Sequence, residues 1–248
     1  MKLLRLLPLL ALLAPLAGVV DARADGPAPA AAPADAELAR LRAAQGHSVK
    51  WNYVPQGQAA RYGHAEVLIQ SPIETVRAYV TDFAHYKEFS SGKFKTSRVI
   101  DRPAPGVTDL YVQVPIFHGM IMLWQVVRFA PARTPSPGTE VIEGTLVRGN
   151  VRASAVILTM RAVDPVTTIL KCDLLITPEM AAPQANVDEE LRDAAQNAID
   201  AIQVRAQTKY AQSITAAVAS ATVTPTPAPS TTVASGSASP PPPADATK

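Results

Sequence analysis

Six strand-like segments follow one another between residues 94 and 176, and a single long amphipathic helix comes after them. Proline, glycine, asparagine and aspartate separate the segments, and the Gly149-Asn150 pair is typical of a tight hairpin. Strands with such short connections pair with their sequence neighbours, which predicts an antiparallel meander. The apolar face of such a sheet must be covered, and the closing helix is long enough to cover it. The expected strands are residues 94–101, 107–114, 120–129, 139–148, 151–163 and 167–176.

One further strand and two short helices precede this meander. Residues 63–70 have the pattern of a strand. The tetrapeptide Ser71-Pro72-Ile73-Glu74 is typical of a helix start, because its serine and glutamate can cap the first turn and proline suits the first helical position. We therefore expect a helix over residues 71–81 and a second helical turn over residues 82–89. Asp82 is interpreted as the N-cap of that second turn, with an acid in a cavity as the alternative.

The closing helix has an acidic first turn and one apolar face. Asn186, Asp188 and Glu189 suit the positive end of the helix dipole. Apolar side chains recur at helical spacing, so this face must lie on the sheet. We expect an α+β helix-grip fold, in which a bent seven-stranded antiparallel sheet is wrapped on the long C-terminal helix. The apolar face consists of Val187, Leu191, Ala194, Ala195, Ala198, Ile202 and Ala206.

The first 24 residues have the pattern of a secretory signal peptide. Lys2 and Arg5 make a positive start, residues 6–20 are apolar, and Ala22-Arg23-Ala24 is a small-residue cleavage site. A membrane anchor is the alternative, but this apolar stretch is shorter than the roughly 20 residues that span a bilayer. We therefore expect a periplasmic or secreted protein that is cleaved after Ala24.

Composition divides the rest of the chain into three parts. We expect an Ala/Pro-rich spacer with a short helix over residues 25–62, a folded domain over residues 63–215, and a disordered Pro/Ser/Thr/Ala-rich tail over residues 216–248. Cleavage removes three cations and one anion, so the formal net charge falls from +2 to 0. A neutral protein has no basic footprint for nucleic acid and no polybasic run for anionic membranes. We expect no nucleic-acid partner and at most transient membrane contact.

The order of elements resembles a known superfamily. The segment VLIQSPIETV (residues 67–76), followed by Asp82-Phe83-Ala84-His85-Tyr86, resembles the START-like (SRPBCC) superfamily, and within it the coenzyme-Q-binding and polyketide-cyclase-like branch. The resemblance covers residues 63–209. It implies a cavity between the sheet and the C-terminal helix that holds an apolar ligand such as a lipid, a quinone or a polyketide-like molecule.

Strand alternation and the small residues on the helix select candidate cavity residues. For each of them the alternative is that it packs as ordinary core. The loop residues Phe117 and His118 are candidates for the cavity mouth, because an imidazole there could titrate near neutral pH; the alternative is an exposed turn without a role. The cavity candidates are Met120, Met122, Trp124, Val156, Leu158, Met160, Leu170, Cys172, Leu174, Leu191, Ala195, Ala198 and Ile202.

The sequence shows no pattern for a cofactor or for catalysis. The four histidines are scattered without metal-ligand spacing, no glycine-rich phosphate loop occurs, and Cys172 lies in an apolar run. We therefore expect no metal and no cofactor, and a noncatalytic binding or carrier protein. One alternative is a cyclase or hydratase-type enzyme, which would need an acid and a base facing one another in the cavity. Another is an interaction module of the envelope. No feature indicates a particular oligomeric state.

Overall fold

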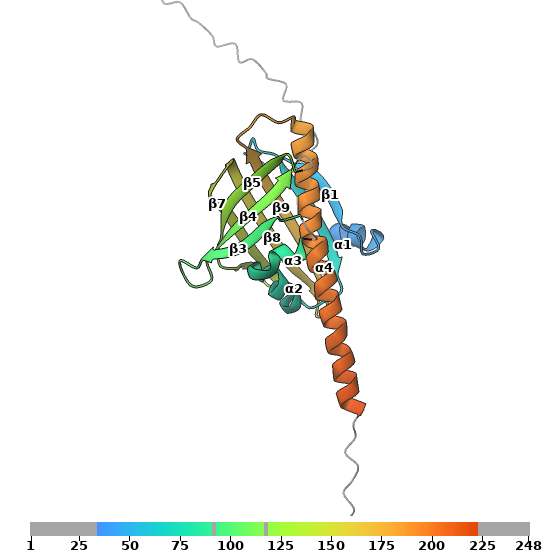
Figure 1. Ribbon diagram of the computed structural model, residues 1–248. Helices are drawn as coiled ribbons and strands as arrows, with labels where there is room; N and C mark the ends of the chain where they lie inside the picture. The colour runs from blue at the N-terminus through green and yellow to red at the C-terminus, as the bar shows by residue number, and fades with distance from the viewer. Residues whose placement is uncertain (1–33, 91–92, 117–118, 223–248) are drawn as a thin grey trace, which may run out of the picture.

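A nine-stranded antiparallel sheet forms the main body of the protein, and one long helix lies across it (Figure 1). The computed structural model describes residues 34–90, 93–116 and 119–222 of the 248-residue chain. The strands are hydrogen-bonded in the order β1-β2-β9-β8-β7-β5-β4-β3, with β6 paired to β7. They are β1 (Val49–Tyr53), β2 (Tyr62–Ile69), β3 (Thr96–Asp101), β4 (Thr108–Ile116), β5 (Ile121–Phe129), β6 (Arg133–Ser136), β7 (Thr139–Gly149), β8 (Val151–Asp164) and β9 (Thr167–Pro178). The helices are α1 (Ala34–Ala43), α2 (Ile73–Val80), α3 (Tyr86–Phe89) and α4 (Gln184–Thr222), with a 3-10 turn, η1 (Phe83–His85).

The expected α+β helix-grip architecture is confirmed. All seven strands predicted from the sequence are present, with ends within two residues of the expected ones. Pro115, expected to end its strand, instead pairs with Met122 inside β4. Asn150 closes the predicted hairpin between β7 and β8. Its side-chain oxygen accepts a 2.7 Å hydrogen bond from the amide of Trp124, and its side-chain nitrogen donates a 2.9 Å bond to the carbonyl of Met122.

Two strands that the sequence analysis did not predict extend the sheet. β1 lies at the edge and pairs with β2, so that Trp51 stands opposite His64. β6 pairs with β7 and is exposed at all four residues. Its sequence, Arg-Thr-Pro-Ser, has no alternation of hydrophobic and polar side chains, so its pairing depends on backbone hydrogen bonds rather than on hydrophobic periodicity.

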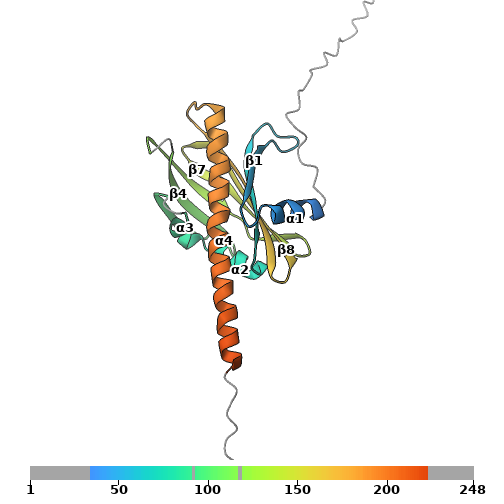
Figure 2. The same ribbon diagram turned by 90° about the vertical axis from the view of Figure 1, so that its right-hand side faces the viewer.

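Helix α1 packs against β2 on the side of the sheet opposite α4 (Figure 2). Leu41 of this helix is only 1% exposed. Glu37 lies 2.6 Å from the ammonium of Lys171 and 3.1 Å from the guanidinium of Arg161. These two ion pairs therefore anchor α1 to the sheet. Residues 25–62 were expected to be a spacer with one short helix; this segment supplies α1 and also the strand β1, which was not expected.

The hydrophobic core lies on the concave face of the sheet, where α4 packs against it. Ala65, Val67 and Ile69 of β2 are fully buried there. Gly63 allows the close approach, because a Cβ atom on it would lie 2.3 Å from the carbonyl carbon of Leu191. The α4 residues buried in this core are Leu191, Ala195, Ile199, Ile202 and Ala206.

The expected capping box at the start of α2 does not form. The helix begins at Ile73, and Pro72 in an extended conformation is the N-cap residue, with no side-chain hydrogen bond. The Ser71 side chain is fully buried, and its hydroxyl has no hydrogen-bond partner. Instead, the backbone carbonyl of Ser71 accepts a 2.8 Å hydrogen bond from the hydroxyl of Thr168 on β9. This turn is therefore held by a hydrogen bond to the sheet and not by a side-chain cap on the helix.

Helix α4 extends farther than the sequence analysis indicates. It continues to Thr222, past the expected end of the folded domain at Thr215, and its C-terminal part projects away from the sheet (Figures 1 and 2). Residues 211–220 are exposed. Across residues 34–90, 93–116 and 119–222, no helix is long and apolar enough to cross a membrane. The predicted signal peptide and most of the predicted tail lie outside the described residues.

Candidate functional site

An apolar cavity of about 80 Å³ lies between the concave face of the sheet and the first turns of α4. It is formed where β4, β5 and the end of β9 meet the helix. Val114 and Ile116 belong to the cross-strand pairs Val114–Leu123 and Ile116–Ile121, so β4 and β5 present a continuous apolar surface. The lining consists of Val112, Val114, Ile116, Leu123, Gln125, Val151, Ile176, Pro178, Val187, Glu190, Leu191 and Ala194.

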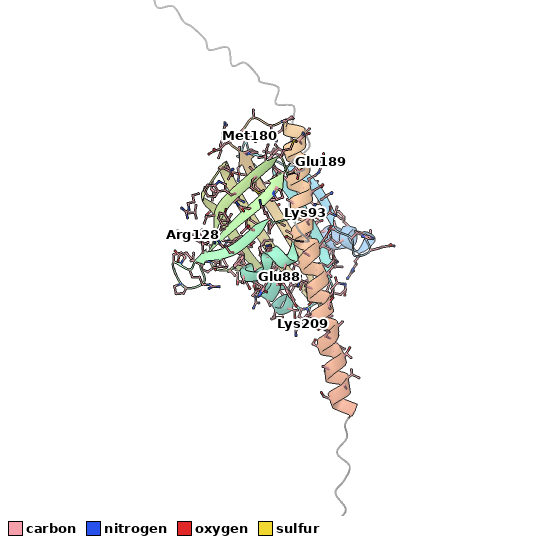
Figure 3. All side chains as sticks on the ribbon, viewed as in Figure 1. Glu88, Lys93, Arg128, Met180, Glu189 and Lys209 are labelled. Atoms are coloured by element: carbon pink, nitrogen blue, oxygen red, sulfur yellow. The ribbon has the colours of Figure 1, made fainter. Side chains whose placement is uncertain are left out.

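A larger cleft of about 520 Å³ adjoins the cavity at the start of α4. It lies under the loop that joins β9 to α4, where Met180 is labelled in Figure 3. Arg61, Arg152 and Thr177 bring polar groups to its lining. Ligand pockets typically measure about 300–1,000 Å³, so the cleft reaches this size and the cavity alone does not. Cavity and cleft share Ile176, Pro178, Val187 and Leu191.

Most of the predicted cavity residues pack in the core rather than around the cavity. Leu191 is the one among them that lines both the cavity and the cleft. Val156 is half-buried against the core. The structure therefore places these side chains in the ordinary core, which was the alternative to a position on the cavity wall. The residues buried in the core are Leu158, Met160, Leu170, Cys172, Leu174, Ala195 and Ile202.

Along β5, the side chains predicted to face the cavity lie on the opposite face of the sheet. Leu123 and Gln125 line the cavity, so Met122 and Trp124, which alternate with them, point to the opposite face. Trp124 lies near the ring of Tyr111 on that opposite face, with 6.2 Å between the ring centroids. Met120 is 80% exposed beside the turn at Gly119.

Two further predictions concern the helix and the cavity mouth. Ala198 is exposed, one turn after Ala194 on the same side of α4, and it does not line the cavity. Ile199 takes the buried position that the sequence analysis assigned to Ala198. Phe117 and His118 lie outside the described residues. The helical spacing did place Val187 and Ala194, both lining residues, on the apolar face.

Two groups with reactive potential are buried away from the cavity. Cys172 is 2% exposed, and burial raises the pKa of its thiol, which agrees with an inert core residue. Burial likewise raises the pKa of Tyr86, whose hydroxyl donates to the carbonyl of Val80. Asp82 stands at the N-cap position of η1, but its carboxylate lies 2.6 Å from the His85 ring instead of capping the turn.

A second cluster of ionisable groups is buried on the opposite side of the sheet, beneath α1. Nδ1 of His64 lies 2.6 Å from the Asp173 carboxylate, and Nε2 lies 3.6 Å from that of Glu66. The Trp51 ring packs on the imidazole, with 4.1 Å between centroids. Arg40 of α1 donates from Nε to Glu66 at 2.8 Å. Because β2 alternates its faces, this cluster cannot reach the cavity.

The carboxylates around His64 set its protonation. Burial by itself lowers the pKa of His64, but the hydrogen bond to Asp173 and the nearby Glu66 outweigh burial and raise the pKa above 6.5. Burial by itself raises the pKa of Glu66, but His64 and Arg40 outweigh it and lower that pKa. The cluster thus places the imidazole between two carboxylates, which favour its charged form. Burial and the Asp173 charge also raise the pKa of Tyr53 beside it.

The His64 cluster should make stability depend on pH. Because folding raises the pKa of His64, its contribution is fully present below pH 6.5 and is lost as the pH rises through the folded-state pKa. We expect the free energy of unfolding to fall across this range in the wild type and to fall less in His64→Gln. Urea unfolding at several pH values between 6 and 9 measures this. The exposed His47→Gln is the control, and parallel profiles for wild type and His64→Gln would contradict the assignment.

The cavity lining offers little acid–base chemistry. Among its described residues, Glu190 is the one titratable side chain, and it is exposed on α4. Within residues 34–90, 93–116 and 119–222, no three His, Cys, Asp or Glu side chains converge so that they could hold a metal ion. The arrangement is therefore suited to enclosing an apolar group beside a polar cleft.

Comparison with known proteins identifies the fold. No protein-family model matches the sequence, and no curated protein matches it. Solved structures do match. One is a STAR-related lipid transfer protein fragment from Xanthomonas axonopodis, with a TM-score of 0.55 and 11% sequence identity, covering 64% of this chain and 93% of that one.

Two human structures are also similar to this chain. The StarD13 lipid transfer and protein localization domain has a TM-score of 0.51 and 14% identity, covering 71% of this chain and 98% of that one. The StAR-related lipid transfer protein 5 has a TM-score of 0.51 and 11% identity, covering 70% and 93%. These identities are low, so the similarity concerns the fold. The resemblance predicted from the sequence is confirmed at that level: this chain has the START-like helix-grip fold.

Proposed function

We propose that this protein binds an apolar small molecule, such as a lipid, between its sheet and α4. The observation that carries the proposal is the apolar cavity beneath the first turns of α4, which shares four lining residues with a cleft of ligand size. A ligand of lipid size would place its apolar part in the cavity and extend along Val187 and Leu191 into the cleft. The fold supports this proposal, since similar structures include proteins named for lipid transfer.

We propose further that the protein holds or carries its ligand without transforming it. An enzyme of the cyclase or hydratase type needs an acid and a base on either side of the reacting atoms. The described cavity lining presents one carboxylate, Glu190, and no second titratable group facing it. The buried His64 cluster lies on the other side of the sheet, away from this space.

We also propose that the protein acts after export. The positively charged start, the apolar stretch and the small-residue cleavage site in residues 1–24 support this proposal. N-terminal sequencing of the protein recovered from the envelope fraction tests it, and Asp25 is the expected first residue.

Blocking the cavity should abolish ligand binding. Ala194 lines the cavity yet is exposed, so Ala194→Phe fills the space without replacing a core residue. We expect the hydrophobe that co-purifies with this variant to fall at least tenfold, since a bulky ring replaces the volume that the ligand needs. Native mass spectrometry, followed by extraction and mass analysis of the bound molecule, measures the loss.

The neighbouring helix position provides the matched control. Ala198 is exposed one turn later on the same side of α4 but does not line the cavity, so Ala198→Phe should keep the bound hydrophobe. Equal occupancy in both variants would contradict binding in this cavity. Recovery of no hydrophobe from the wild-type protein would contradict the proposed function itself.

A further inference from the structure

Among the residues that the structure describes, three buried polar side chains on the strands of the concave face have no hydrogen-bond partner. They are the hydroxyls of Ser97 and Ser154 and the side-chain oxygen Oε1 of Gln125. Ser97 and Gln125 flank Val112, because Val112 pairs with both in adjacent strands. Buried polar groups in native proteins almost always have partners, so such a group on the wall of a cavity requires an explanation.

Gln125 is the member of this set that lines the cavity. The residue is more than nine-tenths buried, at 7% exposure. The residue beside it on β7 is Gly149, on which a Cβ atom would lie 2.9 Å from the Cβ of Gln125. The absence of a side chain at Gly149 therefore leaves room for the Cβ of Gln125, whose amide is the polar group on a sheet wall that is otherwise apolar. The side chains next to Gln125 on the same face of β5, Leu123 and Val127, are buried and apolar, so they cannot form a hydrogen bond with Oε1.

We infer that the ligand carries a hydroxyl group, which donates a hydrogen bond to Oε1 of Gln125 while its apolar body fills the cavity. This inference rests on the proposed function and adds the class of ligand to it. An anionic group is disfavoured at this position, because the one charged side chain among the described lining residues is the carboxylate of Glu190. A pure hydrocarbon would leave Oε1 buried and unpaired, which costs free energy. A neutral hydroxyl satisfies Oε1 without burying a charge.

A matched pair of probes tests the inference. 1-Decanol and decyl methyl ether have the same apolar chain, but only the alcohol can donate a hydrogen bond. We expect the full-length wild-type protein to bind the alcohol roughly tenfold more tightly than the ether, as one hydrogen bond to a buried acceptor allows. In Gln125→Leu the alcohol should lose this advantage, while the affinity for the ether changes less than about twofold. Isothermal titration calorimetry measures both dissociation constants.

The control variant carries the same substitution on the other face. Gln113 pairs with Trp124, whose side chain points away from the cavity, so Gln113→Leu should leave both affinities unchanged. Gln125→Met, which keeps the length of the side chain, replaces Gln125→Leu if circular dichroism shows that the leucine variant does not fold. If the affinities for both probes fell by the same factor in the Gln125 variant, the residue would act by its shape, and the inference would be overturned.

The remaining outcomes separate this inference from the proposed function. Equal affinity of the wild type for alcohol and ether would mean that a water molecule satisfies Oε1; the inference would then be wrong, and apolar binding would stand. Failure of the wild type to bind either probe would contradict apolar binding, and the inference with it. The comparison of the two probes on the wild type needs no variant, so the result does not depend on the folding of a substituted protein.

Discussion

Gly63→Ala is expected to destabilise the protein by about 3 kcal/mol or more, because it forces α4 away from the sheet. A Cβ atom at this position would lie 2.3 Å from the carbonyl carbon of Leu191 and 2.6 Å from the amide nitrogen of Arg192. Both atoms belong to the helix backbone, which cannot rotate aside as a side chain would. Overpacking of a well-packed core typically costs about 1–3 kcal/mol, and a clash between two backbones belongs at the upper end.

Urea unfolding followed by circular dichroism measures the loss of stability in Gly63→Ala. Gly57→Ala is the control, because a Cβ atom there meets nothing within 4 Å. Its backbone has a φ of +77°, so an alanine should cost about 1 kcal/mol from conformation alone. A loss in Gly63→Ala no larger than in the control would show that α4 does not depend on this close approach. Because Leu191 also lines the cavity, the variant should lose its bound hydrophobe as well.

Ile199→Ala is expected to cost about 3 kcal/mol of the free energy of unfolding. Ile199 is fully buried between α4 and the sheet, and replacing a buried isoleucine by alanine typically costs about 2–5 kcal/mol through lost burial and the cavity left behind. The helix propensity of alanine offsets only a few tenths of a kcal/mol of this. Chemical unfolding of the purified variant measures the change.

Val204→Ala is the matched control for Ile199→Ala. Val204 lies on the same helix, is also β-branched, and is 64% exposed. Its replacement should change stability by less than about 0.5 kcal/mol, as is usual for surface positions. Similar losses in both variants would indicate that the helix itself, and not its packing on the sheet, determines the effect.

Much of the architecture could be predicted from the sequence because turns have local chemistry. Glycine, proline, asparagine and aspartate end strands for reasons that act within a few residues, and the amphipathic pattern of a long helix repeats often enough to be recognised. β1 was missed because residues 51–62 show no clear period, although Trp51 and Tyr53 do pack on the sheet. β6 was missed because its four residues show no hydrophobic alternation.

The candidate site was harder to predict, and β5 shows why. Both faces of this strand are largely apolar, with Met122 and Trp124 on one and Leu123 and Val127 on the other. Alternation alone cannot then identify the face that points toward the helix. Gln125 is polar, and a polar residue on one face of a strand usually indicates that this face is exposed to solvent. In the structure, however, Gln125 is buried on the cavity wall. The residue from which the class of ligand is inferred therefore also favours the wrong face of β5 when the sequence is considered alone.

Local patterns in the sequence determined the order of strands and helices, the antiparallel meander and the presence of one helix to cover it. The tertiary structure alone decided which residues meet at the cavity, because that depends on strand register and on how closely α4 approaches β2 at Gly63. A one-residue change of phase exchanges every side chain between the two faces of a strand. The pairing of His64 with Asp173 likewise joins residues more than a hundred positions apart, which no local pattern can reveal.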